Sequence, residues 1–285
     1  MFSKQRWRRF VTLIALLSAL FITLSACAKP KKAATAQTIR TDKLRATTFA
    51  LVASAENSTL RFDHQYRYIE DIGDGRGYTG GIIGFTSGTG DMLKVVQEYV
   101  RLRPKHNALK RYLPALKRVN GTASHKGLGQ QFEIAWRKAG QTHQMIHAQN
   151  TVLDHQYLNV ALRYAKKDHL RPLGQYIYYD ALVVHGPGSA HDKTSFQGIR
   201  KRALKRAKTP AKGGKESTYL NAFLKARTPV MKSEAAHSDL SRLNTQQRFI
   251  NEHKFNLQLP LSWTMYGDHY KLTNKKAEQL ARTFK

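Results

Sequence analysis

The sequence has 285 residues, of which 41% are hydrophobic and 10% aromatic, and this composition excludes a disordered chain. It carries 48 Lys and Arg against 19 Asp and Glu, a formal net charge of +29. So large a surplus favours a polyanionic partner such as nucleic acid, anionic lipid or a wall polymer, with a merely solubilising surface as the alternative.

The first segment of the chain has the pattern of an export signal. Basic residues precede Phe10–Ala26, an uncharged apolar run of 17 residues that is slightly short for a membrane span. The run ends in Leu24–Cys27, which resembles the bacterial lipobox, where the cysteine is lipidated and becomes the new N-terminus. We therefore expect residues 1–26 to be a lipoprotein-type signal peptide and Cys27 to anchor the protein on the outer face of a membrane. The alternative is an ordinary signal peptide, which would release a secreted protein.

Residues 27–42 are small, polar and basic, and they are predicted to form a tether between the lipid anchor and a folded domain. Cys27 is the only cysteine, which excludes a disulfide within the chain. Because an exported protein meets little nucleic acid, we expect no nucleic-acid partner. The basic surface is expected to face anionic lipid headgroups or anionic wall polymers instead.

A helix is predicted after the tether, because apolar residues recur at helical spacing between Leu44 and Ala55, and Glu56 then lies near its C-terminus. The region Tyr66–Phe85 mixes β-forming residues with turn glycines, which predicts a small antiparallel sheet. The chain that follows is predicted to be mostly helical. Its strongest segment is Leu170–His185, which is apolar nearly all round and therefore indicates a central buried helix.

Further helices are predicted from shorter apolar stripes and from helix-forming composition. One stripe covers Met92–Tyr99, and another, Leu109–Leu116, is expected to be interrupted by Pro114. Two more helices are expected at Ser217–His237 and Thr245–His253. Residues 271–285 form a basic tail that is expected to be helical. Nothing in the sequence divides the chain into independent domains.

Two carboxylates stand out near the predicted sheet. Cleavage of a glycosidic bond needs one carboxyl group that donates a proton and one that is ionised. Glu56 suits the first role, because loss of solvent and the negative end of the helix dipole disfavour a charged carboxylate. Asp74 suits the second, because it lies in a polar glycine turn close to Arg76. On these residues alone, solvated surface carboxylates remain the default interpretation.

The segment Glu56–Asp91 contains six acids and three bases, so it is acidic within a strongly basic chain. Such a segment favours a cationic ligand.

The run SAENSTLRFDHQYRYIEDIGDGRGYTGGIIGFTSGTGDM, Ser54–Met92, closely resembles the catalytic core of the family 46 chitosanases. The resemblance extends in consistent order from about Lys43 to Tyr270. It implies a mainly α (α+β), lysozyme-like two-lobed fold with a small antiparallel β-sheet beside the active-site cleft, and a catalytic domain over residues 43–270. Other segments that resemble the family are Tyr112–Gly129, Leu173–Gly188, Thr194–Ala203, Lys208–Arg227 and Glu234–Arg242.

The resemblance also implies roles for single residues. Glu56 matches the general acid, Asp74 the general base and Thr79 a residue that helps to position the attacking water. The family inverts the anomeric carbon, which requires a wide gap between the two carboxyl groups. Asp91 matches a carboxylate that binds a glucosamine amine. Cleft-lining positions are matched by Tyr68, Arg76, His185 and Glu234, and a supporting charged network by Asp180, Arg227 and Arg242.

In this network Asp180 would be neutralised by two arginines, and Arg227 is expected to help keep Asp74 ionised. One departure from the family pattern is that Ser238 and then Asp239 follow Glu234 where a second acid is expected, which bears on the substrate-binding surface. Phe62 stands where a Trp is familiar, an exchange that we expect to be harmless within packing.

The sequence thus predicts an exported, monomeric endo-chitosanase that hydrolyses β-1,4 bonds between the glucosamine residues of chitosan. An inverting general acid/base mechanism needs no metal or organic cofactor. One alternative is a peptidoglycan glycosidase on the same fold. The other is a catalytically inactive surface protein that binds wall polymers.

Overall fold

The computed structural model describes residues 37–233 and 239–284. The chain from Gln37 onward forms one compact unit. Its helices and strands, in chain order, are α2 (Asp42–Glu56), η1 (Phe62–Arg67), β1 (Ile69–Asp71), β2 (Tyr78–Gly80), β3 (Phe85–Thr86), α3 (Asp91–Leu102), η2 (Lys110–Tyr112), α4 (Leu113–Val119), α5 (Gln130–Ala139), α6 (His143–Leu153), the π-helix η3 (Asp154–Leu158), α7 (Asn159–Asp168), α8 (Pro172–His185), α9 (Phe196–Leu204), η4 (Pro210–Lys212), α10 (Glu216–Ser233), α11 (Ser241–Asn251), β4 (Leu261–Met265), β5 (Asp268–Leu272), α12 (Asn274–Ala281) and η6 (Arg282–Phe284).

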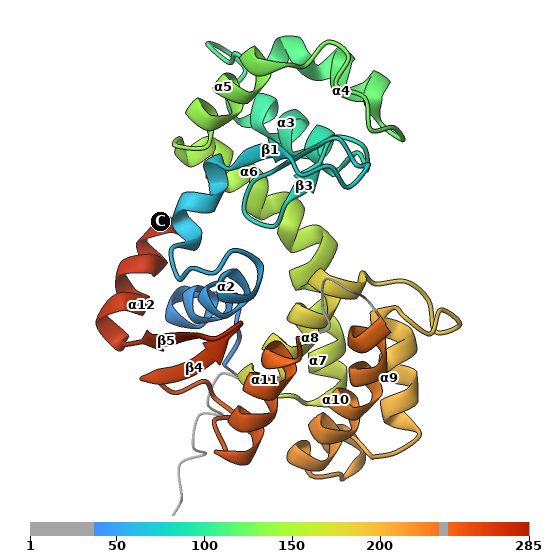
Figure 1. Cartoon of the computed structure of the whole chain (residues 1–285). Coiled ribbons are helices and arrows are strands. Elements are labelled where there is room, and N and C mark those ends of the chain that lie inside the picture. Colours follow the sequence, from blue (N-terminus) through green and yellow to red (C-terminus); the bar gives the residue numbers. More distant parts are fainter. Residues whose placement is uncertain (1–36, 234–238, 285) are drawn as a thin grey trace, which may run out of the picture. The chain divides into compact units, whose positions relative to one another are not determined.

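These elements form two groups, which Figure 1 shows one above the other. One group holds the sheet β1–β3 with α3, α4 and α5, and the other holds α2, the helices from α7 to α12, and the hairpin β4–β5. The helical run through α6, η3 and α7 joins the two groups. The first sheet is antiparallel, with Thr79 opposite both Glu70 and Thr86. The predicted mainly helical fold with a small antiparallel sheet is therefore confirmed.

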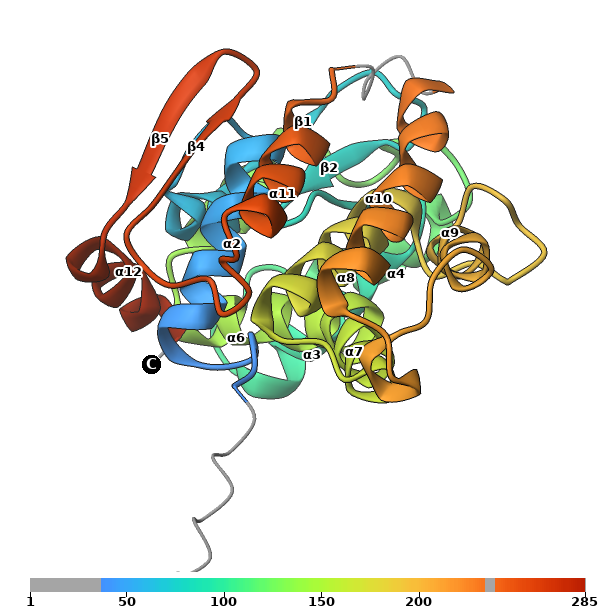
Figure 2. The same ribbon diagram turned by 90° about the horizontal axis from the view of Figure 1, so that it is seen from below.

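Helix α2 is buried along most of its length, from Arg45 to Ala55. Its Phe49 ring stacks on Tyr179 of α8 and meets Phe284 edge-on, with centroids 6.0 and 5.3 Å apart. Trp263 of β4 donates from its indole N–H to Ser54 Oγ over 2.9 Å. Figure 2 shows the β4–β5 hairpin and α12 along one side of this helix. The first helix of the unit is thus held by elements from the end of the chain.

Several sequence predictions are confirmed by the helices α2, α3 and α8, and others need correction. The stripe Leu109–Leu116 falls on two elements, η2 and then α4, and Pro114 occupies the first turn of α4, where proline is well tolerated. The β4–β5 hairpin was not predicted, and α12 packs on α2. Ile39, which was expected in the tether, is fully buried in the core. None of the helices in the described part of the chain combines the length and apolar composition that a membrane span requires.

Candidate active site

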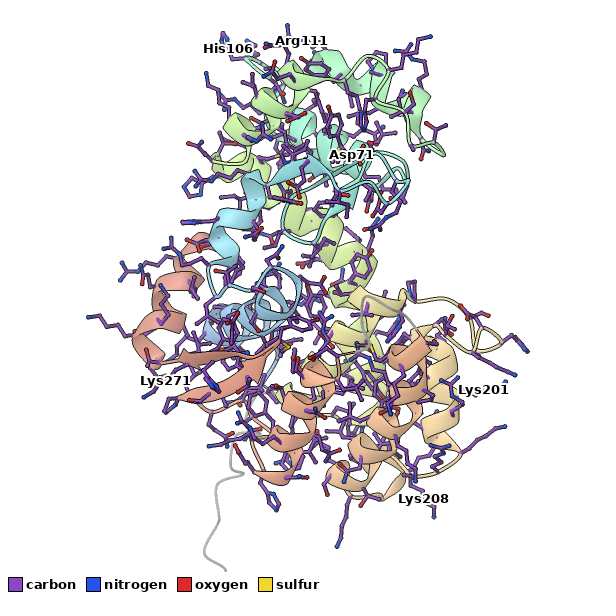
Figure 3. The ribbon with its side chains drawn as sticks, in the orientation of Figure 1. Asp71, His106, Arg111, Lys201, Lys208 and Lys271 are labelled. Carbon is purple, nitrogen blue, oxygen red and sulfur yellow. The ribbon has the colours of Figure 1, made fainter. Side chains whose placement is uncertain are left out.

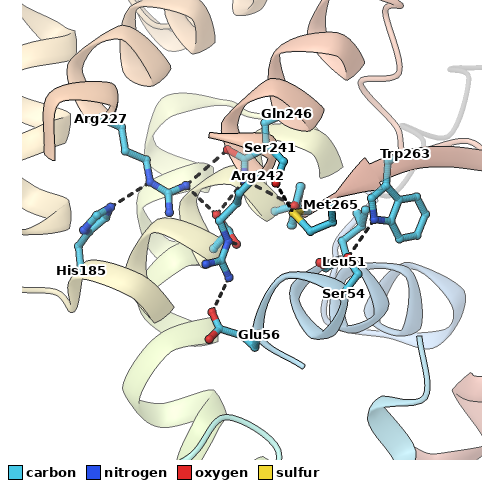
Figure 4. Close-up of polar contacts among 12 residues, drawn as sticks. Leu51, Ser54, Glu56, His185, Arg227, Ser241, Arg242, Gln246, Trp263 and Met265 are labelled. Carbon is cyan, nitrogen blue, oxygen red and sulfur yellow. Dashed lines mark hydrogen bonds and ion pairs between the residues drawn. The ribbon is translucent and has the colours of Figure 1, made fainter. Parts of the chain in front are cut away.

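Glu56 is the last residue of α2, and its side chain is 35% exposed although the preceding turns of the helix are buried. Its Oε1 accepts a hydrogen bond from Arg242 Nη2 on α11 (Figure 4). A small pocket beside Glu56 is lined by Ile82 and Ile83, which belong to the turn between β2 and β3. The end of α2 therefore faces this turn, three residues beyond Thr79.

Behind Glu56 lies a fully buried carboxylate, Asp180 of α8. Its Oδ1 accepts from Arg242 Nε over 2.9 Å, and its Oδ2 accepts from Arg227 Nη1 over 2.6 Å and from Gln246 Nε2 over 2.8 Å. Burial by itself would raise the pKa of Asp180, but Arg242 and Arg227 outweigh it and lower the pKa to about 2. Asp180 is thus an anion at neutral pH, and it holds the two arginine side chains in fixed positions.

The end of this network differs from the prediction. The expected members Asp180, Arg227 and Arg242 are joined, but the carboxylate that they reach is Glu56 rather than Asp74. Arg227 is fully buried and donates from Nε to His185 Nε2 over 3.0 Å. The reason for the difference is that Arg242 extends from α11 to the end of α2, whereas the turn that carries Asp74 provides its own cation.

That cation is Arg76. Its backbone N–H donates to Asp74 Oδ1 over 3.0 Å, and its Nε donates to Oδ2 over 2.8 Å. Hydrogen bonding from the Arg76 side chain lowers the pKa of Asp74, so the aspartate stays ionised. The chain can turn tightly here because Gly77 has a positive φ of 71° and a Cβ in its place would collide with Ser87 Oγ. The predicted ionised carboxylate is in a suitable environment.

Thr79 is the middle residue of β2 and is only 6% exposed. Its Oγ1 is buried and has no hydrogen-bond partner among the residues that the structure describes. A buried hydroxyl without a partner is costly and uncommon, and a bound water is the simplest group that could satisfy it. This hydroxyl could therefore hold a water molecule.

Asp91 begins α3, and its Oδ1 accepts from Thr86 N, Thr89 Oγ1 and Met92 N at 2.7, 2.9 and 2.8 Å. Burial raises the pKa of Asp91, and these donors oppose the rise. Tyr157 of the π-helix η3 interacts electrostatically with both Asp91 and Arg76. Three elements thus meet around Asp91.

Tyr157 was not predicted from the sequence, and no local motif marks it. The irregular turn that carries it is a π-helix, and such turns are frequent at functional sites.

The remaining predicted residues fall into three classes. Tyr68 is half-buried, with its hydroxyl bonded to Glu70 and its carbonyl accepting from Trp136 Nε1 over 2.9 Å. Phe62 is fully buried and stacks on Phe284, so it serves in packing, as expected. Cys27, Glu234 and Ser238 lie outside the described residues.

Known proteins of one hydrolase family are similar to this chain over most of its length. The model of Glycosyl hydrolase family 46 matches residues 50–261. A chitosanase of Streptomyces sp. (strain N174) is 58% identical over 221 residues, which cover 77% of this chain and 78% of the relative. A chitosanase of Bacillus subtilis (strain 168) is 34% identical over 225 residues, covering 74% and 78%.

Solved structures agree with this match. A co-crystal structure of chitosanase OU01 with substrate superposes with a TM-score of 0.78 at 48% identity, covering 84% of this chain and 100% of that one. A chitosanase complex structure gives a TM-score of 0.77 at 49% identity, covering 83% and 99%. The fold is thus the lysozyme-like fold of these enzymes. The chain belongs to glycosyl hydrolase family 46 and is a hydrolase of glycosidic bonds.

Proposed function

We propose that this protein is an endo-acting chitosanase that cleaves β-1,4 bonds between glucosamine residues with inversion. Glu56 acts as general acid, and Asp74 acts as general base on a water molecule that Thr79 helps to hold. The observation that carries the proposal is the contact between the helix-end Glu56 and the buried Arg242 of the Asp180 network. The relatives that are named chitosanases support the choice of substrate.

Glu56 is partly exposed and paired with Arg242, so its environment differs from the desolvated one predicted from the sequence. Arg242 instead stabilises the carboxylate that remains after Glu56 has released its proton. The arginine occupies Oε1, so the proton to be donated resides on Oε2. Once the proton has passed to the leaving oxygen, the new carboxylate stays paired with a cation whose own position Asp180 fixes. Stabilisation of charge that develops during the reaction, by a group that needs no reorganisation, is an efficient source of catalysis.

The residues that activate the attacking water lie in the first sheet and in the turn between β1 and β2. Asp74 stays ionised beside Arg76 and takes a proton from the attacking water. The Thr79 hydroxyl, which has no partner within the described part of the chain, supplies a hydrogen bond to that water. Inversion requires roughly 6.5–9.5 Å between the two carboxyl groups. Asp91 keeps its Oδ2 for a sugar ammonium group, which suits a cationic substrate better than a neutral one.

The test compares Glu56→Gln and Asp74→Asn with Glu133→Gln, a surface carboxylate paired with Arg137 in α5. Reducing ends released from chitosan are counted, and proton NMR identifies the anomer that forms first. The first two variants should lose activity by orders of magnitude and still bind chitosan, whereas Glu133→Gln should behave like the parent. A near-normal rate in either catalytic variant, or a product with retained configuration, would refute the mechanism. Release from purified cell wall but not from chitosan would instead favour the peptidoglycan alternative.

We also propose that the protein is exported and anchored through a lipid on Cys27. The basis is the sequence pattern of residues 1–27, which lie outside the described part of the chain. In a bacterial host, the parent should partition into the detergent phase of an extract, and Cys27→Ser into the aqueous phase. An unchanged partition of the Cys27→Ser variant would contradict lipidation.

A further inference from the structure

Several adjoining elements of the second group carry exposed positive charge. α7 packs against η4, and α9 packs against α10, so these elements form a continuous part of the unit. Figure 3 shows Lys201 and Lys208 pointing outward from this side. We name the exposed bases here the lysine face; they are Arg163, Lys166, Lys167, Lys201, Lys205, Arg206, Lys208, Lys212 and Lys215.

The acids near the lysine face do not neutralise it. Asp168 of α7 is buried and pairs with Arg200, whose Nε lies 2.8 Å from Oδ2. Glu216 of α10 pairs with Arg171 over 2.6 Å and is also largely buried. No acid occurs between Lys193 and Lys215 in the sequence. Across the described residues, no side chain of the lysine face takes part in an ion pair, so its charge is available to an external partner.

The folded unit begins beside this face. The carbonyl of Gln37 accepts from Gln175 Nε2 over 3.0 Å, and the N–H of Ile39 donates to Gln175 Oε1 over 3.0 Å. The same Gln175 amide reaches the carbonyl of Leu170, just beyond α7. Arg40 donates over 2.6 Å to Asn159, at the start of α7. The chain therefore enters the fold alongside α7, which carries three bases of the lysine face.

Cys27 precedes Gln37 by ten residues, which can span at most about 35 Å when fully extended. A lipid on Cys27 would therefore keep the α7 side of the unit near the bilayer. Glu56 lies at the opposite end of α2 from this entry point, and 15 helical residues separate the two ends by about 22 Å. An orientation with the lysine face toward the membrane would thus leave Glu56 directed away from it.

We propose that the lysine face is a membrane-binding surface that contacts the headgroups of anionic phospholipids. It acts together with the lipid anchor proposed above, and it is independent of the chitosanase activity. The diacyl anchor expected on Cys27 already holds the protein at a membrane, and a basic surface adds affinity for anionic lipid and favours one orientation of the folded unit. Anionic lipid attracts lysines near its surface and loses this attraction within a Debye length, so the short connection to Gln37 matters.

The experiment uses the chain from Gln37 to Lys285. This unit is compact by itself, and related solved chains are covered to 99% and 100% by matches that span 83% and 84% of this chain. Binding is measured by sedimentation with vesicles of phosphatidylcholine alone and with vesicles rich in phosphatidylglycerol. The test variant replaces four lysines of the face with glutamine: Lys166, Lys167, Lys208 and Lys212. The matched control replaces four exposed lysines of the other group: Lys105, Lys110, Lys117 and Lys126.

The parent should bind only the anionic vesicles. Each lysine near such a surface contributes about fivefold to binding, so the test variant, which loses four, should bind roughly 600-fold more weakly. The control, with the same net charge, should stay within about tenfold of the parent. Equal losses of vesicle binding in both variants would show that only the net charge matters. Binding to poly(glycerol phosphate) but not to vesicles would show that the surface binds wall polymers. Either result would overturn the proposal. Hydrolysis of short glucosamine oligomers is measured in parallel, so a failed membrane proposal is distinguished from a failed chitosanase assignment.

Discussion

Replacement of Asp180 by asparagine tests what the negative charge of this side chain contributes, because the volume of the side chain is kept. The asparagine side chain would keep the volume of the aspartate but lose the anion that faces Arg227 and Arg242. Both guanidinium groups are at most 1% exposed, so water cannot take the place of the missing charge. The variant would therefore leave two like charges buried close together, with Glu56 as the only carboxylate among the described residues still in contact with them.

The size of the effect follows from the structure in two ways. The pKa of Asp180, about 2 against an ordinary value of 3.8, corresponds to about 2 kcal/mol of stability at neutral pH. Removal of one partner from a buried pair typically costs about 3–5 kcal/mol, because the remaining charge stays desolvated. The cost of about 3–5 kcal/mol fits the substitution better, since it includes the two buried arginines that would lose their anionic partner. It corresponds to a fall in Tm of about 6–20 °C for a unit of this size.

The free energy of unfolding is measured by urea titration, together with the rate on chitosan. Asp63→Asn provides the matched control, because Asp63 pairs with an Arg61 side chain that is 42% exposed, and it should cost less than about 1 kcal/mol. Asp180→Asn should also lower kcat at least tenfold, since Arg242 would no longer be held toward Glu56. A loss of stability no greater than that of the control would refute the reasoning, since the network would then contribute nothing beyond an exposed pair.

Three further predictions concern the catalytic face and the charged exterior. Thr79→Val keeps the side-chain shape and removes a buried hydroxyl that has no partner among the described residues. The free energy of unfolding should therefore not fall, while the rate on chitosan should fall at least tenfold. A loss of stability without a loss of rate would contradict the role of Thr79. Arg76→Gln removes the hydrogen bond that lowers the pKa of Asp74, so the acidic limb of kcat/KM should move to higher pH, and an unmoved limb would exclude Asp74 as its origin. Activity on chitosan should rise from low to physiological salt, because screening weakens repulsion between the cationic polymer and a chain of charge +29, and a flat or falling profile would count against this repulsion.

The native contribution of Asp180 also has a defined pH dependence. Its pKa is lower in the folded state than in the unfolded chain, so the stabilisation is complete above about pH 4 and is lost as the pH falls toward 2. Measurements of Tm across this window should show a shallower decline for Asp180→Asn than for the parent.

Local sequence patterns correctly predicted those elements that are determined by residues close to one another in the chain. Helix α2 follows from apolar spacing, and the turn around Asp74 follows from its glycines and its neighbour Arg76. The predicted interruption near Pro114 corresponds to the change from η2 to α4 at Leu113, and the proline is tolerated because it lies in the first turn of α4.

Contacts between distant segments could not be predicted in the same way. Arg242 lies 186 residues from Glu56, and the identity of the carboxylate it contacts depends on how α11 packs beside α2 and α8. The family resemblance identified the members of the network but assigned its end to Asp74. Tyr157 shows the same limit, since its approach to Asp91 and Arg76 arises from the π-helical turn between α6 and α7.

Helix α2 lies early in the chain, whereas several of its packing partners lie near the C-terminal end of the sequence. Ser54 is bonded to Trp263 across 209 residues, and Lys43 pairs with Glu278 across 235. During synthesis the helix therefore lacks most of its packing surface until nearly the whole polypeptide has left the ribosome, and loop closure over such distances is slow. The helix that carries Glu56 therefore becomes fixed in place only when synthesis of the chain is nearly complete.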